Sequence, residues 1–257
     1  MRATWQVVGD ASGEPRAAWG PIEVARADGA GSAQGEGRAP GCSLRIASGS
    51  CSLRGGRRTN ADWLVKRPPL FAVADGFGTE QLAGALSRVA CREAVRLWEA
   101  GSDPVGAVER ANGAVLAVQD LAGERGCGTT LALVELLGGR GAELAWVGDS
   151  AVLLVRPGER GARWLTSCER TEGGRLSSAL GVGKPLVRGA RAELAAGDIV
   201  VLATDGAWEP LGDDLAGILA CNGPATEGGL RAAAARICRA AVERGGDNAS
   251  VVLVAVG

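Results

Sequence analysis

The chain has 257 residues, and its 28 Lys and Arg against 29 Asp and Glu give a formal net charge of −1. That balance argues against a general affinity for nucleic acid or an anionic membrane. Histidine and tyrosine are both absent, which excludes a Ser-His-Asp triad, a Cys-His dyad and a His-ligated zinc or haem site within this chain. An enzyme of this composition must use carboxylates, arginines, backbone dipoles or metal-bound water.

Residues 1–41 are rich in Gly, Ala, Pro and charge without sustained periodicity, and we expect a flexible lead-in with one candidate strand near Thr4–Val8. Residues 42–257 have the alternating apolar and polar segments of one folded domain. The seven cysteines are scattered and form no C-x-x-C pair, which is typical of reduced thiols. The sequence shows no apolar signal core and no apolar run of membrane-spanning length, so we expect a soluble, cytoplasmic protein.

Short apolar or alternating runs bounded by Gly, Asp or Asn predict strands. They are Leu70–Asp75, Thr130–Leu137, Glu143–Asp149, Ala151–Arg156, Ile199–Thr204 and Ser250–Val256. The third and fourth runs are joined so tightly that they predict either a hairpin or one bent strand. Apolar residues at helical spacing predict helices over 82–98, 105–118 and 230–242. Strands in hairpin-like succession, with helices in blocks, favour an α+β fold with antiparallel sheets.

Four aspartates lie at strand ends beside Gly, Ser or Asn. Asp75, Asp149 and Asp205 each follow an apolar run, and Asp247 precedes the last one. Each motif alone is explained by turn chemistry, because Asp-Gly pairs are common turn formers. Four such carboxylates that converge without histidine describe an oxygen-only site for Mg²⁺ or Mn²⁺.

An ordered set of motifs resembles PP2C-type (PPM) metal-dependent serine/threonine protein phosphatases, from about residue 43 to the C-terminus. The motifs are Arg57-x-x-Asn60-Ala61-Asp62, Asp75-Gly76-Phe77-Gly78, Gly128-Thr129-Thr130, Val147-Gly148-Asp149-Ser150, Ala203-Thr204-Asp205-Gly206 and Asp247-Asn248. The resemblance implies a four-layer α/β/β/α sandwich, with two central antiparallel sheets flanked by helices and a two-metal centre at one rim.

The resemblance also implies which residues hold the metals. Asp75 would bridge two Mn²⁺ or Mg²⁺ ions, and the Gly76 carbonyl would bind one of them. Asp205 and Asp247 would complete the shell of the first ion. Asp149, together with Asp205, would match the family's more weakly held third-metal site.

Two further roles follow from the same resemblance. Asp62 would stand near the second ion and hold bound water, and Arg57 would grip the phosphate of a phosphorylated protein substrate. Metal-activated water would then hydrolyse phosphoserine or phosphothreonine without a protein nucleophile. This chemistry agrees with the residue inventory, since metals lower the pKa of water and a guanidinium fits phosphate bidentately.

Two departures from the family pattern bear on the function. Ala61 replaces a glutamate that orders water on the second metal, and the flap before Leu176 is very short and starts with Cys168-Glu169 instead of an Asp-His pair. The short flap suggests an open site or a dedicated protein partner. Both departures keep an alternative function open, namely a catalytically weak phosphoprotein-binding regulator.

A second enzyme class is suggested by the C-x5-R pattern of cysteine-dependent phosphatases. Cys51 to Arg57 fits it, as does Cys238 to Arg244, which lies on a predicted helix. The flanking signals of a phosphate loop are missing, so the pattern favours a chance match.

Overall fold

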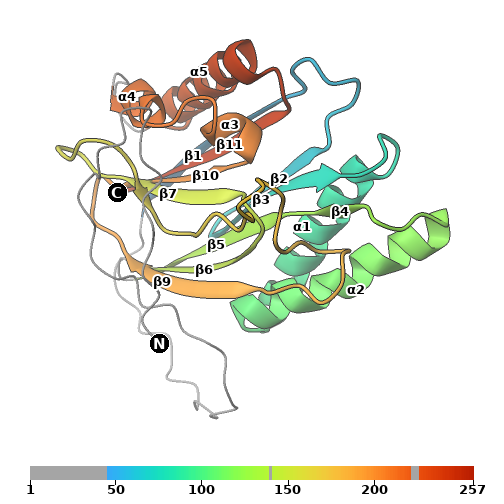
Figure 1. The fold of residues 1–257 in the computed structure, drawn as a ribbon. Coiled ribbons are helices and arrows are strands. Elements are labelled where there is room, and N and C mark those ends of the chain that lie inside the picture. Colours follow the sequence, from blue (N-terminus) through green and yellow to red (C-terminus); the bar gives the residue numbers. More distant parts are fainter. Residues whose placement is uncertain (1–44, 139–140, 221–225) are drawn as a thin grey trace.

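The computed structural model describes residues 45–138, 141–220 and 226–257. The expected lead-in over 1–41, with its candidate strand near Thr4–Val8, lies outside these ranges. Two antiparallel sheets stack face to face, and helices cover the outer face of each (Figure 1). The predicted fold class, an α/β/β/α sandwich, is confirmed.

The first sheet has the strand order β2-β3-β5-β6-β9, with β4 paired to the end of β3. Its strands are β2 (Asp62–Arg67), β3 (Leu70–Phe77), β4 (Gly128–Thr129), β5 (Leu131–Leu137), β6 (Gly141–Val147) and β9 (Arg188–Glu193). Two long helices, α1 (Ala83–Glu99) and α2 (Pro104–Ala122), cover it. The capping residues of α2 set its length, because Asp103 accepts a hydrogen bond from the Gly106 N–H at 2.9 Å and Gly123 ends the helix at φ 69°.

The second sheet has the strand order β1-β11-β10-β7-β8. Its strands are β1 (Ile46–Leu53), β7 (Ala151–Val155), β8 (Arg163–Trp164), β10 (Ile199–Ala203) and β11 (Ala249–Val256). The helices on its outer face are α3 (Asp205–Trp208), α4 (Asp214–Ala220) and α5 (Glu227–Gly245). Every residue of β11 is buried, which explains its unbroken apolar sequence.

Strand periodicity separates the core into layers. In β3, Phe71 and Val73 point between the sheets, whereas Leu70, Ala72 and Ala74 point toward α1 and α2. Both faces of β3 are buried, which explains why its sequence is a continuous apolar run. The run ends at Asp75, where the strand reaches the rim of the sandwich.

Both alternatives for 143–149 and 151–156, a hairpin and one bent strand, are wrong. Strand β6 pairs with β5 and β9, while β7 pairs with β10 and β8, so the chain passes from one sheet to the other at this point. Gly148 makes the sharp turn possible with φ 90°. The crossover places Asp149 at the rim between the two sheets.

Candidate active site

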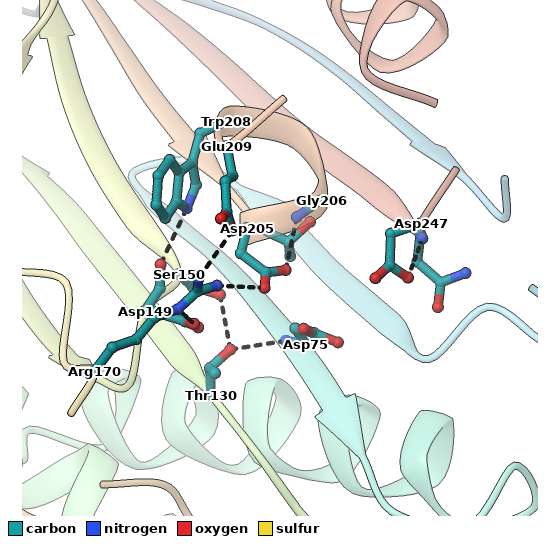
Figure 2. Close-up of polar contacts among 12 residues, drawn as sticks. Asp75, Thr130, Asp149, Ser150, Arg170, Asp205, Gly206, Trp208, Glu209 and Asp247 are labelled. Atoms are coloured by element: carbon teal, nitrogen blue, oxygen red, sulfur yellow. Dashed lines mark hydrogen bonds and ion pairs between the residues drawn. The ribbon is translucent and has the colours of Figure 1, made fainter. Parts of the chain in front are cut away.

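The four strand-end aspartates meet at one rim of the sandwich, around a cavity of about 350 Å³. Each comes from a different segment. Asp75 is near the end of β3, Asp149 lies in the crossover, Asp205 starts α3 and Asp247 precedes β11 (Figure 2). Arg57 and Arg170 also line the cavity. The expected convergence of distant acids is therefore present in the fold.

The end of β3 is held by the Gly-Thr-Thr motif that follows α2. The Thr130 hydroxyl accepts a hydrogen bond from the Asp75 N–H at 2.9 Å, and the Thr129 hydroxyl donates to the Asp75 carbonyl at 2.9 Å. Thr130 also shares a 2.7 Å hydrogen bond with Ser150, next to Asp149. Thr130 thus links the backbone of Asp75 to the side chain of Ser150, the neighbour of Asp149 (Figure 2).

The carboxylate of Asp75 is surrounded by other acids. Burial raises its pKa well above the usual range, and the charges of Asp62, Asp205 and Asp149 add to the rise. Within the described ranges, no ion pair joins Asp75 to a basic side chain. Its charge is therefore the least compensated of the four.

Asp62 lies directly opposite Asp75 in the register of β2 and β3. Its side chain accepts a 2.8 Å hydrogen bond from the Thr204 hydroxyl at Oδ2, while Oδ1 is buried and has no partner among the described residues. Burial raises its pKa to about 6. Asp62 is behind the cavity lining and faces a neighbouring hollow with Trp63, so its predicted place beside a second metal stays a prediction.

Arg57 reaches the cavity from the loop between β1 and β2. Its Nη2 donates to Asp247 Oδ2 at 2.6 Å, and its side chain is 63% exposed. The neighbouring Asn248 fixes this loop, because its amide donates to the Arg54 and Thr59 carbonyls at 2.6 and 3.0 Å and accepts from the Ala61 N–H at 2.8 Å. Of this Asp-Asn pair, Asp247 therefore binds Arg57 in the cavity, and Asn248 holds the loop that carries Arg57.

Arg170 is a site residue that the sequence analysis missed. Its guanidinium donates to Asp149 at 2.6 Å, to Asp205 at 2.8 Å and to Glu209 at 2.9 Å (Figure 2). Burial raises the pKa of Asp149 despite this contact, because the carboxylate has been removed from water. The only sequence signal was its place directly after Cys168-Glu169, where the chain departs from the family pattern.

Gly76 lies near the end of β3 and packs against the start of α1. A Cβ there would come within 2.1 Å of the Ala83 carbonyl oxygen and 3.0 Å of the Ala61 carbonyl oxygen, so only glycine fits. Its amide donates to the Ala61 carbonyl at 3.1 Å. This packing leaves the Gly76 backbone in the wall of the cavity.

These donors suit divalent cations in their chemistry. They are oxygen atoms only, and the mutual repulsion around Asp75 is what a bound cation would relieve. Over the described ranges, no group of three or more acidic or Cys side chains is arranged as a ready metal cage. Arg57 and Arg170 hold three of the four aspartates, so cations would have to draw Asp205 and Asp247 toward Asp75.

Cys51 is not part of a phosphate loop. It lies within β1, opposite Val251 of β11, and outside the cavity lining. A hydrogen bond with Cys238 lowers its pKa to about 7, with burial opposing the change and Arg239 aiding it. Because a strand cannot wrap phosphate with successive N–H groups, the cysteine-dependent alternative is wrong.

The four-layer sandwich and its rim of acids define the class of PP2C-type (PPM) phosphatases. The profile of the family described as Stage II sporulation protein E (SpoIIE) matches residues 69–256, and the chain belongs to this family. The predicted PP2C-type relationship is thereby confirmed. No curated protein sequence matches the chain significantly. In the described residues, no helix has both the length and the apolar character needed to span a membrane.

Several solved structures share the fold. The serine/threonine phosphatase PstP/Ppp of Mycobacterium tuberculosis is 24% identical with a TM-score of 0.72, covering 82% of this chain and 98% of its own. The catalytic domain of PstP in complex with two manganese ions is 26% identical with a TM-score of 0.70, covering 83% and 99%. PppA of Pseudomonas aeruginosa is 24% identical with a TM-score of 0.72, covering 82% and 98%.

Proposed function

We propose that this protein is a metal-dependent serine/threonine phosphatase that hydrolyses phosphoserine and phosphothreonine in a phosphorylated protein substrate. The observation that carries the proposal is the meeting of Asp75, Asp149, Asp205 and Asp247 around one cavity. The similar PstP catalytic domain, solved with two manganese ions, supports Mn²⁺ or Mg²⁺ as the cofactor.

The residues that would hold the cations are Asp75, the Gly76 carbonyl, Asp205 and Asp247. When bound, divalent cations lower the pKa of coordinated water and neutralise charge on phosphoryl oxygens. Asp62 has one carboxylate oxygen without a partner in the described part of the chain, and this atom is available to orient a water molecule. Its predicted role in water binding rests on that atom.

Arg57 is suited to grip the substrate phosphate. It stands at the mouth of the cavity, largely exposed, and among the described residues its one ion pair is with Asp247. A cation that took over Asp247 would free the guanidinium. A guanidinium presents paired N–H donors to phosphate oxygens, so Arg57 can align the phosphoryl group and balance its charge as the ester bond breaks.

The alternative function, a catalytically weak phosphoprotein-binding regulator, is not favoured. A pure binding surface has no need for buried acids that repel one another, and a dianionic phosphate would be repelled by them unless cations were bound. The retained acids therefore support catalysis, although Ala61 replaces the family's glutamate.

Hydrolysis of para-nitrophenyl phosphate and of a phosphothreonine peptide tests the proposal. We expect activity with Mn²⁺ and its loss after chelation with EDTA. Asp75→Ala and Asp205→Ala should each lower kcat/KM by roughly 10²-fold or more, as removal of a group that stabilises the transition state does. Asp120→Ala is the matched control, because Asp120 is an exposed partner of Arg125 on α2. Full activity in both cavity variants, or equal activity with EDTA, would refute the proposal.

A further inference from the structure

Arg170 occupies the position that the family resemblance assigns to a third cation, between Asp149 and Asp205. We propose that the guanidinium of Arg170 replaces this ion as a built-in positive charge, so that the chain binds two divalent cations and not three. The inference rests on the proposed function for the two remaining ions. It concerns only the position between Asp149 and Asp205.

The contacts of Arg170 resemble those of a metal ion in one respect, since one cationic group joins acids from separate segments. Nε bonds Asp149 in the sheet crossover, and Nη2 bonds Asp205 at the start of α3. Nη1 bonds Glu209, directly after α3. Three nitrogens therefore serve three carboxylates, at 2.6, 2.8 and 2.9 Å. A cation placed between Asp149 and Asp205 would have to take the place of the guanidinium that these two carboxylates share.

The backbone that carries Arg170 is anchored to the same crossover as Asp149. Glu169 is 6% exposed, and its carboxylate accepts from the Gly148 N–H at 3.2 Å and from Arg188 Nε at 2.6 Å. The Glu169 N–H donates to the Gly148 carbonyl at 3.2 Å, and the Ser177 N–H donates to the Glu169 carbonyl at 2.9 Å. These bonds hold the backbone at Arg170 beside that of Asp149.

Trp208 supports the same arrangement from α3. Its indole N–H donates to the Asp149 carbonyl at 3.1 Å, and its ring lies 5.9 Å from the Arg170 guanidinium carbon. Trp164 packs edge-on against this ring, with the centroids 5.0 Å apart. An aromatic face toward a guanidinium favours the cation in place.

The two cavity arginines differ in a way that separates their roles. Arg57 is 63% exposed and holds one carboxylate, whereas Arg170 is 23% exposed and holds three. Arg57 is therefore the one that cations and phosphate can displace, while Arg170 stays. Asp205 can serve both partners, because each carboxylate oxygen has two lone pairs and Arg170 uses one side of Oδ2.

The test counts bound ions on the full-length chain. Metal-stripped protein is titrated with Mn²⁺ to millimolar concentration, and free Mn²⁺ is measured by electron paramagnetic resonance. We expect two ions in the wild type and three in Arg170→Gln. The double variant R170Q/D149N should return to two, which places the added ion at Asp149. Arg175→Gln, an exposed arginine of the same hairpin, is the control and should keep two.

A second readout is the melting temperature without metal. Arg170→Gln should lower it by roughly 5–10 °C, because buried Asp149 loses its counter-charge. Added Mn²⁺ should raise the melting temperature more in this variant than in the wild type.

Three ions in the wild type would overturn the proposal, and this result does not require that the variant fold. An equal number of ions in wild type and Arg170→Gln would overturn it too. No Mn²⁺ on the wild type would instead count against the proposed function, while the gain of one ion in the variant would still support the role of Arg170.

Discussion

The four cavity aspartates have similar sequence contexts, but their charges have different partners in the structure. Asp149 and Asp205 share Arg170, and Asp247 pairs with Arg57. Asp75 faces other carboxylates, and its raised pKa records their repulsion along with burial. The need for an added cation is therefore concentrated at Asp75, the residue that the motif resemblance assigns to bridge two ions.

From the raised pKa of Asp62, we predict that the metal-free protein loses stability as the pH rises. Burial raises the pKa of its carboxyl group to about 6, against the opposing hydrogen bonds of Ser250 and Thr204, so the folded state holds this proton more tightly than the unfolded chain. The stabilisation is complete below the unfolded pKa near 4 and is lost as the pH rises through about 6, about 3 kcal/mol in all.

Asp62→Asn should therefore flatten the pH dependence of the free energy of unfolding between about pH 4 and 6. Urea denaturation of metal-stripped protein measures this free energy. Asp75 shifts in the same direction and will leave some residual slope. Asp120→Asn, on the exposed face of α2, should keep the wild-type slope, and an unchanged slope in Asp62→Asn would contradict the account.

At the scale of elements, the shortened flap becomes a small hairpin around Arg170. Arg170 and Leu176 pair across it, and the Thr171 N–H donates to the Arg175 carbonyl at 2.8 Å. Gly174 and Leu176 of this hairpin line the cavity together with Arg170. The expectation that substrate choice depends on an open site or a dedicated partner stays a prediction.

The close packing of α5 on β1 requires a glycine at position 49. A Cβ on Gly49 would lie 2.2 Å from the backbone nitrogen of Arg231 and 2.3 Å from the carbonyl carbon of Leu230. Because neither backbone atom can rotate away, Gly49→Ala should cost about 3 kcal/mol of stability. Gly113 is the matched control, since it is exposed on α2 and a methyl group there would have no described atom within 4 Å. Gly113→Ala should gain about 0.5–1 kcal/mol.

Thermal unfolding of both variants measures the contrast. Phosphatase activity well below the melting temperature should match the wild type in each, because neither glycine lines the cavity. Equal melting temperatures for the two variants would show that the helix and strand separate easily, against the close approach in the structure.

The sequence predicted the central strands and missed those at the sheet edges. β3, β5, β6, β7, β10 and β11 were expected from their apolar runs, whereas β1 and β8 flank one sheet and β2 and β9 flank the other. An edge strand pairs on one side and tolerates polar residues, so the segments Ile46–Leu53 and Arg188–Glu193 carry little apolar signal. Helix α3 has four residues, too few for a periodic pattern.

At the scale of the whole molecule, the ordered motifs predicted which acids converge, because each stands where a strand reaches the rim. They did not predict Arg170, whose position depends on the crossover between sheets and on the hairpin that Glu169 anchors. Nor did they predict that Asp62 would lie behind the cavity lining. Side-chain contacts between segments that are distant in the chain produce no periodic pattern in the sequence, so they could not be predicted from it.

The domain boundary near residue 42 yields a prediction for the whole chain. In the described part of the chain, the core clusters are built from residues between Ile46 and Val256, and the first strand begins at Ile46. A variant spanning 42–257 should therefore melt within about 2 °C of the full chain, as changes outside a core do. Its kcat/KM on para-nitrophenyl phosphate should be unchanged within about twofold, because the cavity lining begins at Arg57. Calorimetry and the phosphatase assay measure the two quantities. A large drop in melting temperature would place residues 1–41 inside the folding unit, and a drop in kcat/KM alone would mean that they act on the site.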